Sequence, residues 1–190
     1  MAQITKEFIV PIPSALRSMS FDVRWTGLRR VTRLHAPQCW QRWLTDRASL
    51  TQHLLTASQG NFRVEVVRQG WARPTRSEAL ALGIPMRQLA LIREVQLLGN
   101  DQVWVYARSI IPASTMTGRE RQLSHIGNRS LGTILFTDPT MRRSPLQITQ
   151  LNLINQQKVW ARRSTFFLSG KPLLVCEVFL PALEQVNYCP

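Results

Sequence analysis

The chain of 190 residues has few cysteines, few histidines and no long apolar run. Cys39, Cys176 and Cys189 form no Cys-x-x-Cys pair, and their odd number does not suit a disulfide framework. The three histidines show no metal-ligand spacing, which predicts that no metal is bound. No segment approaches the roughly 20 apolar residues of a membrane span, and the N-terminus lacks the apolar core of a signal peptide. We therefore expect a cytoplasmic protein with reduced thiols and no membrane insertion.

Acidic residues are also scarce, and the chain is strongly basic. It has 24 lysine and arginine residues against 11 acidic ones, a formal net charge of +13, and 21 of the 24 are arginine. Arginine suits bidentate recognition of carboxylate or phosphate, so nucleic-acid binding is one interpretation. The basic residues form only scattered pairs, however, and aromatic residues are not interleaved with them as in single-strand binders. We expect no nucleic-acid partner and a protein that attracts a small anion.

The length of the chain predicts one domain with a sizeable core. Residues 1–36 have weak periodicity and predict an irregular N-terminal extension with one short strand or helix at most, before a domain at residues 37–190. Residues 37–57 predict two short helices, the second starting at the Ser-x-x-Gln capping box of residues 49–52. A helical segment is expected between Pro112 and about Gly127, and another helix from Ser130.

Alternating and apolar runs predict the strands. One strand is expected at residues 62–70, and two hairpins at residues 89–98 with 103–111 and at residues 159–168 with 172–180. The turns Gly99-Asn100-Asp101 and Ser169-Gly170-Lys171 have the composition of hairpin loops. Strand pairs with helices between them indicate an α+β fold, an antiparallel sheet covered by helices.

Glu177 is the one charged residue in the apolar run 173–180. The period of two places its side chain on the same face as Val175 and Phe179, so a buried strand carries it inward. An ionised carboxylate is costly to bury unless it is paired or hydrogen-bonded, which implies a partner cation or a ligand. From this residue alone, an internal ion pair with an arginine is the favoured interpretation.

Arg93 has the parity of the apolar residues of its strand and is also expected to face inward, whereas Glu94 and Gln96 face outward. The direction of Arg108 stays open, because both faces of its strand are apolar. The helix starts at Leu50 and Leu131 offer free N–H groups and could hold one carboxylate together with Arg93. The alternative is that both are ordinary caps and that Arg93 pairs with Glu177.

Several segments closely resemble the bacterial chorismate lyase family. They lie at residues 92–94, 107–115, 130–132 with 135–137, 160–164 and 168–181, and the resemblance runs in the family's order from about Trp40 to Pro181. It implies a single α+β domain whose antiparallel sheet carries two helix-turn-helix flaps over a buried ligand. It also implies an enzyme that converts chorismate to 4-hydroxybenzoate and pyruvate, the first committed step of ubiquinone biosynthesis, without metal or organic cofactor.

The resemblance also implies roles for five residues. The family's carboxylate-binding arginine corresponds to Arg93, its flap leucine to Leu131, and its glutamate at the ring hydroxyl to Glu177. Its flap methionine corresponds to Leu50, a departure that is compatible with contact through the backbone N–H. Arg108 corresponds to another family arginine, which we assign to the enolpyruvyl carboxylate. Arg93 and Glu177 are the candidate catalytic residues, and all five are candidate substrate-binding residues.

Two further expectations accompany the resemblance. The partners are the small molecules chorismate and 4-hydroxybenzoate, and the protein is expected to be a monomer. The alternative function is a non-catalytic effector-binding domain of the same fold, as in bacterial transcription regulators. That domain normally follows a winged-helix segment, whereas only about 36 residues precede the resemblance here.

Overall fold

The computed structural model describes residues 19–28, 36–188 and 190. Residues 1–18, 29–35 and 189 lie outside the described residues, together with Cys189 and any short strand or helix that the predicted N-terminal extension has in those ranges. In the described part of the chain, no helix is long and apolar enough to cross a membrane.

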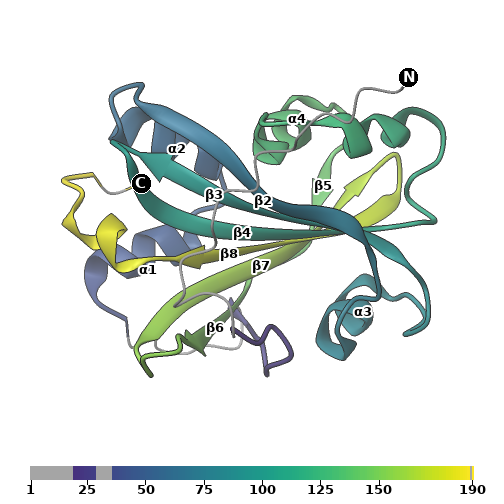
Figure 1. Cartoon of the computed structure of the whole chain (residues 1–190), viewed down its shortest axis with the longest axis horizontal. Helices are drawn as coiled ribbons and strands as arrows, with labels where there is room; N and C mark the ends of the chain where they lie inside the picture. The colour runs from purple at the N-terminus through teal and green to yellow at the C-terminus, as the bar shows by residue number, and fades with distance from the viewer. Residues whose placement is uncertain (1–18, 29–35, 189) are drawn as a thin grey trace, which may run out of the picture.

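A single antiparallel sheet forms the centre of the described structure (Figure 1). Its strands are β1 (Thr26–Gly27), β2 (Phe62–Ala72), β3 (Ala90–Gly99), β4 (Gln102–Pro112), β5 (Arg142–Arg143), β6 (Gln147–Asn152), β7 (Lys158–Leu168) and β8 (Lys171–Phe179). They are ordered β1-β6-β7-β8-β4-β3-β2, and β5 pairs with β7 outside this path. With the helices described below, this architecture confirms the predicted α+β class.

Two tight hairpins set the register of the central strands. The β3–β4 turn places Asn100 and Asp101 at φ of 51° and 62°, and the β7–β8 turn places Ser169 and Gly170 at 50° and 79°. Two successive residues with positive φ are what a type I′ turn requires, and its twist matches that of paired strands. Both predicted hairpins are therefore confirmed, but each turn has two residues and not three, because Gly99 and Lys171 belong to the strands.

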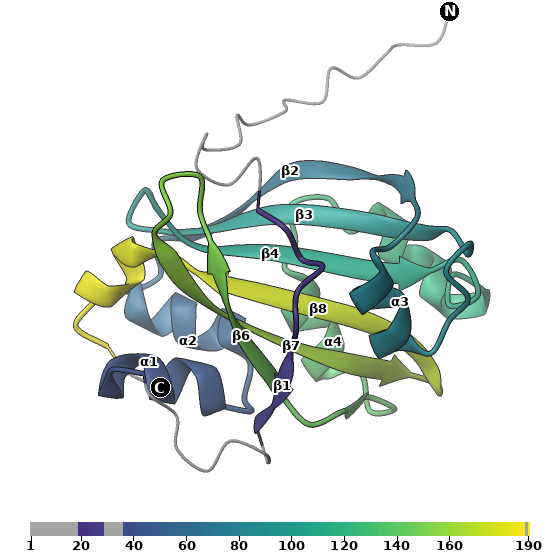
Figure 2. The ribbon, with the colours of Figure 1, turned by 90° about the horizontal axis from the view of Figure 1, so that it is seen from below.

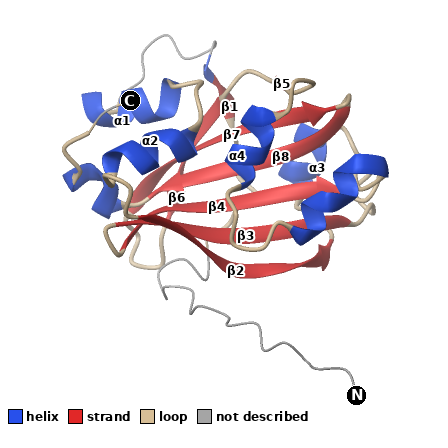
Figure 3. Ribbon diagram, turned by 90° about the horizontal axis from the view of Figure 1, so that it is seen from above, coloured by secondary structure: helices blue, strands red, loops and turns tan. Residues whose placement is uncertain are grey.

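Helices cover both faces of the sheet. They are α1 (Gln38–Thr45), α2 (Leu50–Ala57), α3 (Arg76–Leu82) and α4 (Leu131–Thr137), with 3₁₀ helices at Gly118–His125 and Pro181–Gln185. One face carries α1, α2 and α4 (Figure 3). The opposite face carries α3 and residues 19–28, which run across the strands and end in β1 (Figure 2).

The second covered face corrects one prediction. Glu94 and Gln96 were expected to face solvent, but they are 8% and 2% exposed. The reason is a second apolar cluster on that face, where Phe21 of the N-terminal segment packs with Tyr106 and with residues of β2, β6, β7 and β8. Both faces of β3 are therefore buried.

The helices also differ from prediction in two places. Ser49 is the N-cap of α2, but its side chain makes no capping hydrogen bond, so the predicted capping box is wrong. A complete capping box lies instead between Thr75 and Glu78 and starts α3, which the sequence analysis did not predict. The expected helix between residues 112 and 127 is reduced to a turn and the 3₁₀ helix, because Gly118 and Gly127 adopt φ of about 60°.

Candidate functional site

A cavity lies between the sheet and the flaps that contain α2 and α4. The empty space between them, including its opening to solvent, is about 580 Å³. Most of the lining is apolar, and its polar and charged side chains belong to Thr51, Arg93, Ser109, Ser130, Arg143, Arg162 and Glu177. Leu50 and Leu131 line the same cavity.

Alternate residues of neighbouring strands make the floor of this cavity. The pairings across β3, β4 and β8 place Arg93, Ser109 and Val175 in one row and Val95, Ala107 and Glu177 in the next. By strand geometry the Cα atoms of Arg93 and Glu177 are roughly 12 Å apart, two strand spacings across and two residues along. The two inward-facing charges therefore occupy different ends of the cavity floor.

Arg93 is a buried cation whose described partners are all neutral. Arg93 is only 2% exposed. Its guanidinium donates hydrogen bonds to Gln69 Oε1 at 3.1 Å, Gly127 O at 2.7 Å and Arg129 O at 3.3 Å. No described carboxylate lies within ion-pair distance of it. Burial lowers the pKa of the Arg93 guanidinium to about 10, so the group stays charged near neutral pH. A charge in this setting lacks the anion that normally compensates burial.

Glu177 pairs with Arg162 of β7 and not with Arg93. Arg162 Nε lies 2.5 Å from Glu177 Oε2, and the two residues are directly opposite each other in the β7–β8 ladder. Arg162 also donates from Nη1 to Trp43 O and Asp46 O at 2.6 and 2.8 Å, where α1 ends. The ion pair thus holds one oxygen of Glu177 at the cavity. The two bonds to carbonyl oxygens connect Arg162 of β7 to the end of α1.

The first turns of α2 and α4 meet at the cavity without side-chain caps. Neither Ser49 nor Ser130 caps its own helix. The Ser130 hydroxyl instead forms a hydrogen bond of 2.6 Å with Thr51 Oγ1, which joins the two flaps. The first N–H groups of a helix have no partner within the helix, so these buried turns present backbone donors beside the cavity.

Arg143 is a further cavity arginine that the sequence analysis did not identify. It lies on the short strand β5, where its Nε donates to Ser164 Oγ at 3.1 Å and its Nη1 to Arg47 O at 3.0 Å. Its guanidinium stacks 4.9 Å from the centre of the Phe166 ring. Burial is the main cause that lowers the pKa of Arg143 to about 10.

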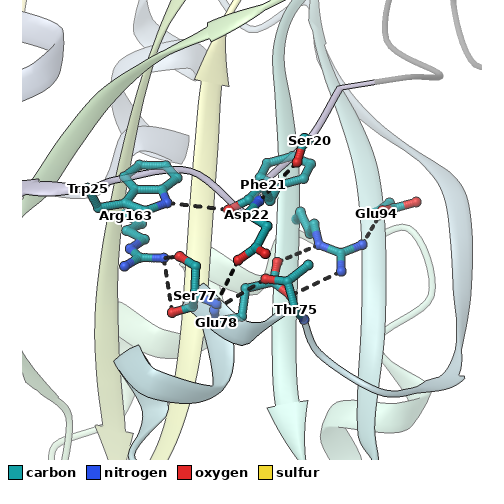
Figure 4. Close-up of polar contacts among 10 residues, drawn as sticks. Ser20, Phe21, Asp22, Trp25, Thr75, Ser77, Glu78, Glu94 and Arg163 are labelled. Atoms are coloured by element: carbon teal, nitrogen blue, oxygen red, sulfur yellow. Dashed lines mark hydrogen bonds and ion pairs between the residues drawn. The ribbon is translucent and has the colours of Figure 1, made fainter. Parts of the chain in front are cut away.

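Arg108 is the predicted site residue that the structure places elsewhere. It does not line the cavity, and its guanidinium binds Glu78 at 2.7 Å and Glu94 at 2.5 Å. These partners belong to a polar cluster with Phe21 and α3 on the opposite face of the sheet (Figure 4). Two buried carboxylates therefore already compensate the charge of Arg108, so this position lends no support to its predicted role at the enolpyruvyl carboxylate.

The sequence matches one known family over nearly all of the described chain. A family model described as chorismate lyase matches residues 19–187. A relative from Methylococcus capsulatus, named "Probable chorismate pyruvate-lyase", is 40% identical over an alignment of 157 positions that covers 77% of this chain and 97% of the relative. The chain belongs to the chorismate lyase family. A relative of the same name from Pseudomonas savastanoi pv. phaseolicola is 40% identical and aligns over 74% of this chain and 79% of its own.

Solved structures show that the chorismate lyase fold occurs more widely. The ligand-binding domain of a protein assigned to the GntR family of transcriptional regulators, from Bordetella bronchiseptica, superposes with a TM-score of 0.52. It covers 69% of this chain and 90% of that domain, at 12% sequence identity. At this identity the similarity shows a shared fold and nothing about the ligand.

The described residues contain no cluster of side chains typical of a metal site. Among residues 19–28, 36–188 and 190, no group of three or more histidine, cysteine, aspartate or glutamate side chains is arranged to hold a metal ion. The cavity offers guanidinium, hydroxyl and backbone N–H donors together with one carboxylate. This donor set favours an anionic organic ligand with at least one hydroxyl group.

Proposed function

We propose that the protein is a chorismate pyruvate-lyase that converts chorismate to 4-hydroxybenzoate and pyruvate. The observation that carries this function is Arg93, a buried guanidinium that lines the cavity with only neutral partners among the described residues. Membership of the chorismate lyase family supplies the substrate class. A carboxylate bound to Arg93 compensates its charge with charge-assisted hydrogen bonds.

The two ends of the cavity suit the two ends of the ring. In chorismate, as in 4-hydroxybenzoate, the ring carboxylate and the ring hydroxyl lie on opposite ring carbons. Arg93, with the backbone N–H groups of Leu50 and Leu131, binds the ring carboxylate, and Glu177 accepts a hydrogen bond from the hydroxyl. Leu50 contributes only its backbone here, so its side chain is free to differ from the family's methionine.

The reaction is an elimination that makes the ring aromatic. The C3–O bond of chorismate breaks and its electron pair stays on the ether oxygen, which leaves as the enolate of pyruvate. The proton on C4 departs, and the electrons of that C–H bond form the C3–C4 double bond. The enolate carbon then takes up a proton to give pyruvate. Glu177 is the carboxylate beside C4, and we assign it to orient the hydroxyl and to receive this proton.

The finer features of this proposal are those that the resemblance to the family led us to expect. We assign the reaction to the first committed step of ubiquinone biosynthesis, in the cytoplasm, by a monomer that needs neither metal nor organic cofactor. The cavity has arginine side chains at both ends, which matches a substrate with two carboxylates. Flaps joined through Thr51 and Ser130 enclose the ligand, as lids do in other enzymes that exclude water.

A direct test follows both products. Purified protein is mixed with chorismate in the presence of a metal chelator, and 4-hydroxybenzoate and pyruvate are quantified by chromatography. We expect the wild type to form 4-hydroxybenzoate and pyruvate in equal amounts. Glu184→Ala, a variant at an exposed carboxylate, should form as much as the wild type, and Glu177→Ala should form much less.

The shared fold of regulator ligand-binding domains defines the second candidate function, binding without catalysis. A folded wild-type protein that binds 4-hydroxybenzoate but forms no product above the spontaneous background would contradict the lyase and support that alternative.

A further inference from the structure

Two guanidinium groups and one carboxylate line the Glu177 end of the cavity. Arg162 binds Glu177 directly at 2.5 Å. Arg143 donates to Ser164, which lies two residues from Arg162 on the same face of β7, and all three of Arg143, Arg162 and Glu177 line the cavity. The three cavity residues Arg143, Arg162 and Glu177 therefore carry one uncompensated positive charge.

The same end also has unused hydrogen-bond donors. Arg162 is 1% exposed, and its Nη2 is buried without a hydrogen-bond partner among the described residues. The partners of Arg143 are a hydroxyl and a backbone carbonyl, both neutral. Burying a charged donor without an acceptor is costly, so both groups favour a ligand that brings an anionic oxygen.

The structure of chorismate places a second anion at this end. Its enolpyruvyl ether is attached to C3, the ring carbon next to the hydroxyl-bearing C4. If Glu177 binds the C4 hydroxyl, the enolpyruvyl carboxylate lies beside Glu177 and far from Arg93. Arg143 and Arg162 line the cavity at that end, and Arg108 is outside it.

We propose that Arg143, assisted by Arg162, binds the enolpyruvyl carboxylate of chorismate and so distinguishes the substrate from the product. This inference rests on the lyase function proposed above. With it, the uncompensated charges of the cavity, one at Arg93 and one at the Arg143–Arg162 pair, equal the two negative charges of chorismate. The product 4-hydroxybenzoate has only the ring carboxylate and leaves the Arg143 end without an anion.

The test compares substrate and product on matched variants. Arg143→Gln removes the charge, Arg143→Lys keeps it without the bidentate fork, and Arg142→Gln is the control at the exposed neighbour on β5. For each protein, kcat/KM is measured with chorismate and Kd with 4-hydroxybenzoate by calorimetry. A charge-assisted hydrogen bond of about 1.5–3 kcal/mol corresponds to a factor of roughly 10–150.

We expect Arg143→Gln to lower kcat/KM for chorismate by roughly that factor while the Kd of 4-hydroxybenzoate changes less than about twofold, with partial recovery in Arg143→Lys. An unchanged kcat/KM, or an equal loss for both ligands, would overturn the role of Arg143. If the wild type does not turn chorismate over, the lyase function fails. In that case the Kd values of chorismate and 4-hydroxybenzoate, measured by calorimetry on the same variants, test whether Arg143 binds the second carboxylate independently of turnover.

Discussion

Arg162 Nε lies 2.5 Å from Glu177 Oε2, and these two residues face each other across the β7–β8 ladder at the cavity floor. The pair fixes the carboxylate in place, because Arg162 is itself held by two backbone carbonyls at the end of α1. One oxygen of Glu177 is committed to this ion pair. The other oxygen accepts no hydrogen bond from the described residues and is available to a ligand.

Glu177→Gln keeps the shape of the side chain and removes its charge and basicity. If Glu177 receives the C4 proton, we expect kcat for chorismate to fall by roughly 10²–10⁴-fold, the usual contribution of a positioned base. Steady-state kinetics by product chromatography measures this, with Glu184→Gln as the control at an exposed carboxylate. Near-normal turnover would remove Glu177 from proton transfer and leave it only an orienting role.

Arg108→Met tests whether that arginine is structural. Its removal leaves Glu78 and Glu94 as uncompensated buried carboxylates, and breaking such a pair typically costs about 3–5 kcal/mol of unfolding free energy. We expect a loss of that size in denaturant unfolding. The folded fraction should retain kcat/KM for chorismate within about twofold of wild type, because Arg108 does not line the cavity.

Arg63→Met is the matched control, because Arg63 also pairs with two carboxylates, Glu65 and Asp101, but on the surface. Because solvent screens this exposed pair, we expect little change in the free energy of unfolding. A stable Arg108→Met variant that had lost chorismate turnover would restore Arg108 to the active site.

Thr51→Val removes the hydrogen bond that joins the two flaps and preserves the volume of the side chain. Because the Thr51–Ser130 bond of 2.6 Å closes the cavity between α2 and α4, we expect 4-hydroxybenzoate to dissociate faster. A hydrogen bond of about 1 kcal/mol corresponds to roughly a fivefold change. Stopped-flow displacement of bound 4-hydroxybenzoate measures the rate.

Thr56→Val is the control for this change, since among the described residues the Thr56 hydroxyl bonds only to Gln52 O, within the same helix. If product release limits turnover, kcat should rise together with the dissociation rate in Thr51→Val. An unchanged dissociation rate would show that the Thr51–Ser130 bond does not restrain the flaps.

The hairpins and the inward direction of Arg93 and Glu177 were predictable from sequence, because turn chemistry and strand parity are local. The partner of Glu177 was predictable in principle as well. A two-residue turn at Ser169 and Gly170 fixes the pairing of β7 with β8, and this register places Arg162 opposite Glu177. The predicted turn was one residue longer, Ser169-Gly170-Lys171, and its register would place Arg163 opposite Glu177 instead.

Two other features depended on contacts that are distant in sequence. Arg108 pairs with Glu94 in the β3–β4 ladder and so lies on the face opposite Arg93, and that face is covered by α3 and by residues 19–28. Neither could be paired with β4 from local patterns, because both faces of that strand are apolar. Arg143 lies on a strand of two residues with no periodicity of its own, and only the pairing of β5 with β7 brings it to the cavity.

The most direct test of the anion-binding cavity is a calorimetric titration of 4-hydroxybenzoate into the wild type, Arg93→Gln and the exposed-site control Arg87→Gln. The wild type and Arg87→Gln should bind with the same affinity. Arg93→Gln should lose at least about 1.5–3 kcal/mol of binding free energy, the contribution of a charge-assisted hydrogen bond to a buried carboxylate. Unchanged binding by a folded Arg93→Gln protein would contradict the assignment of this buried cation to the ring carboxylate.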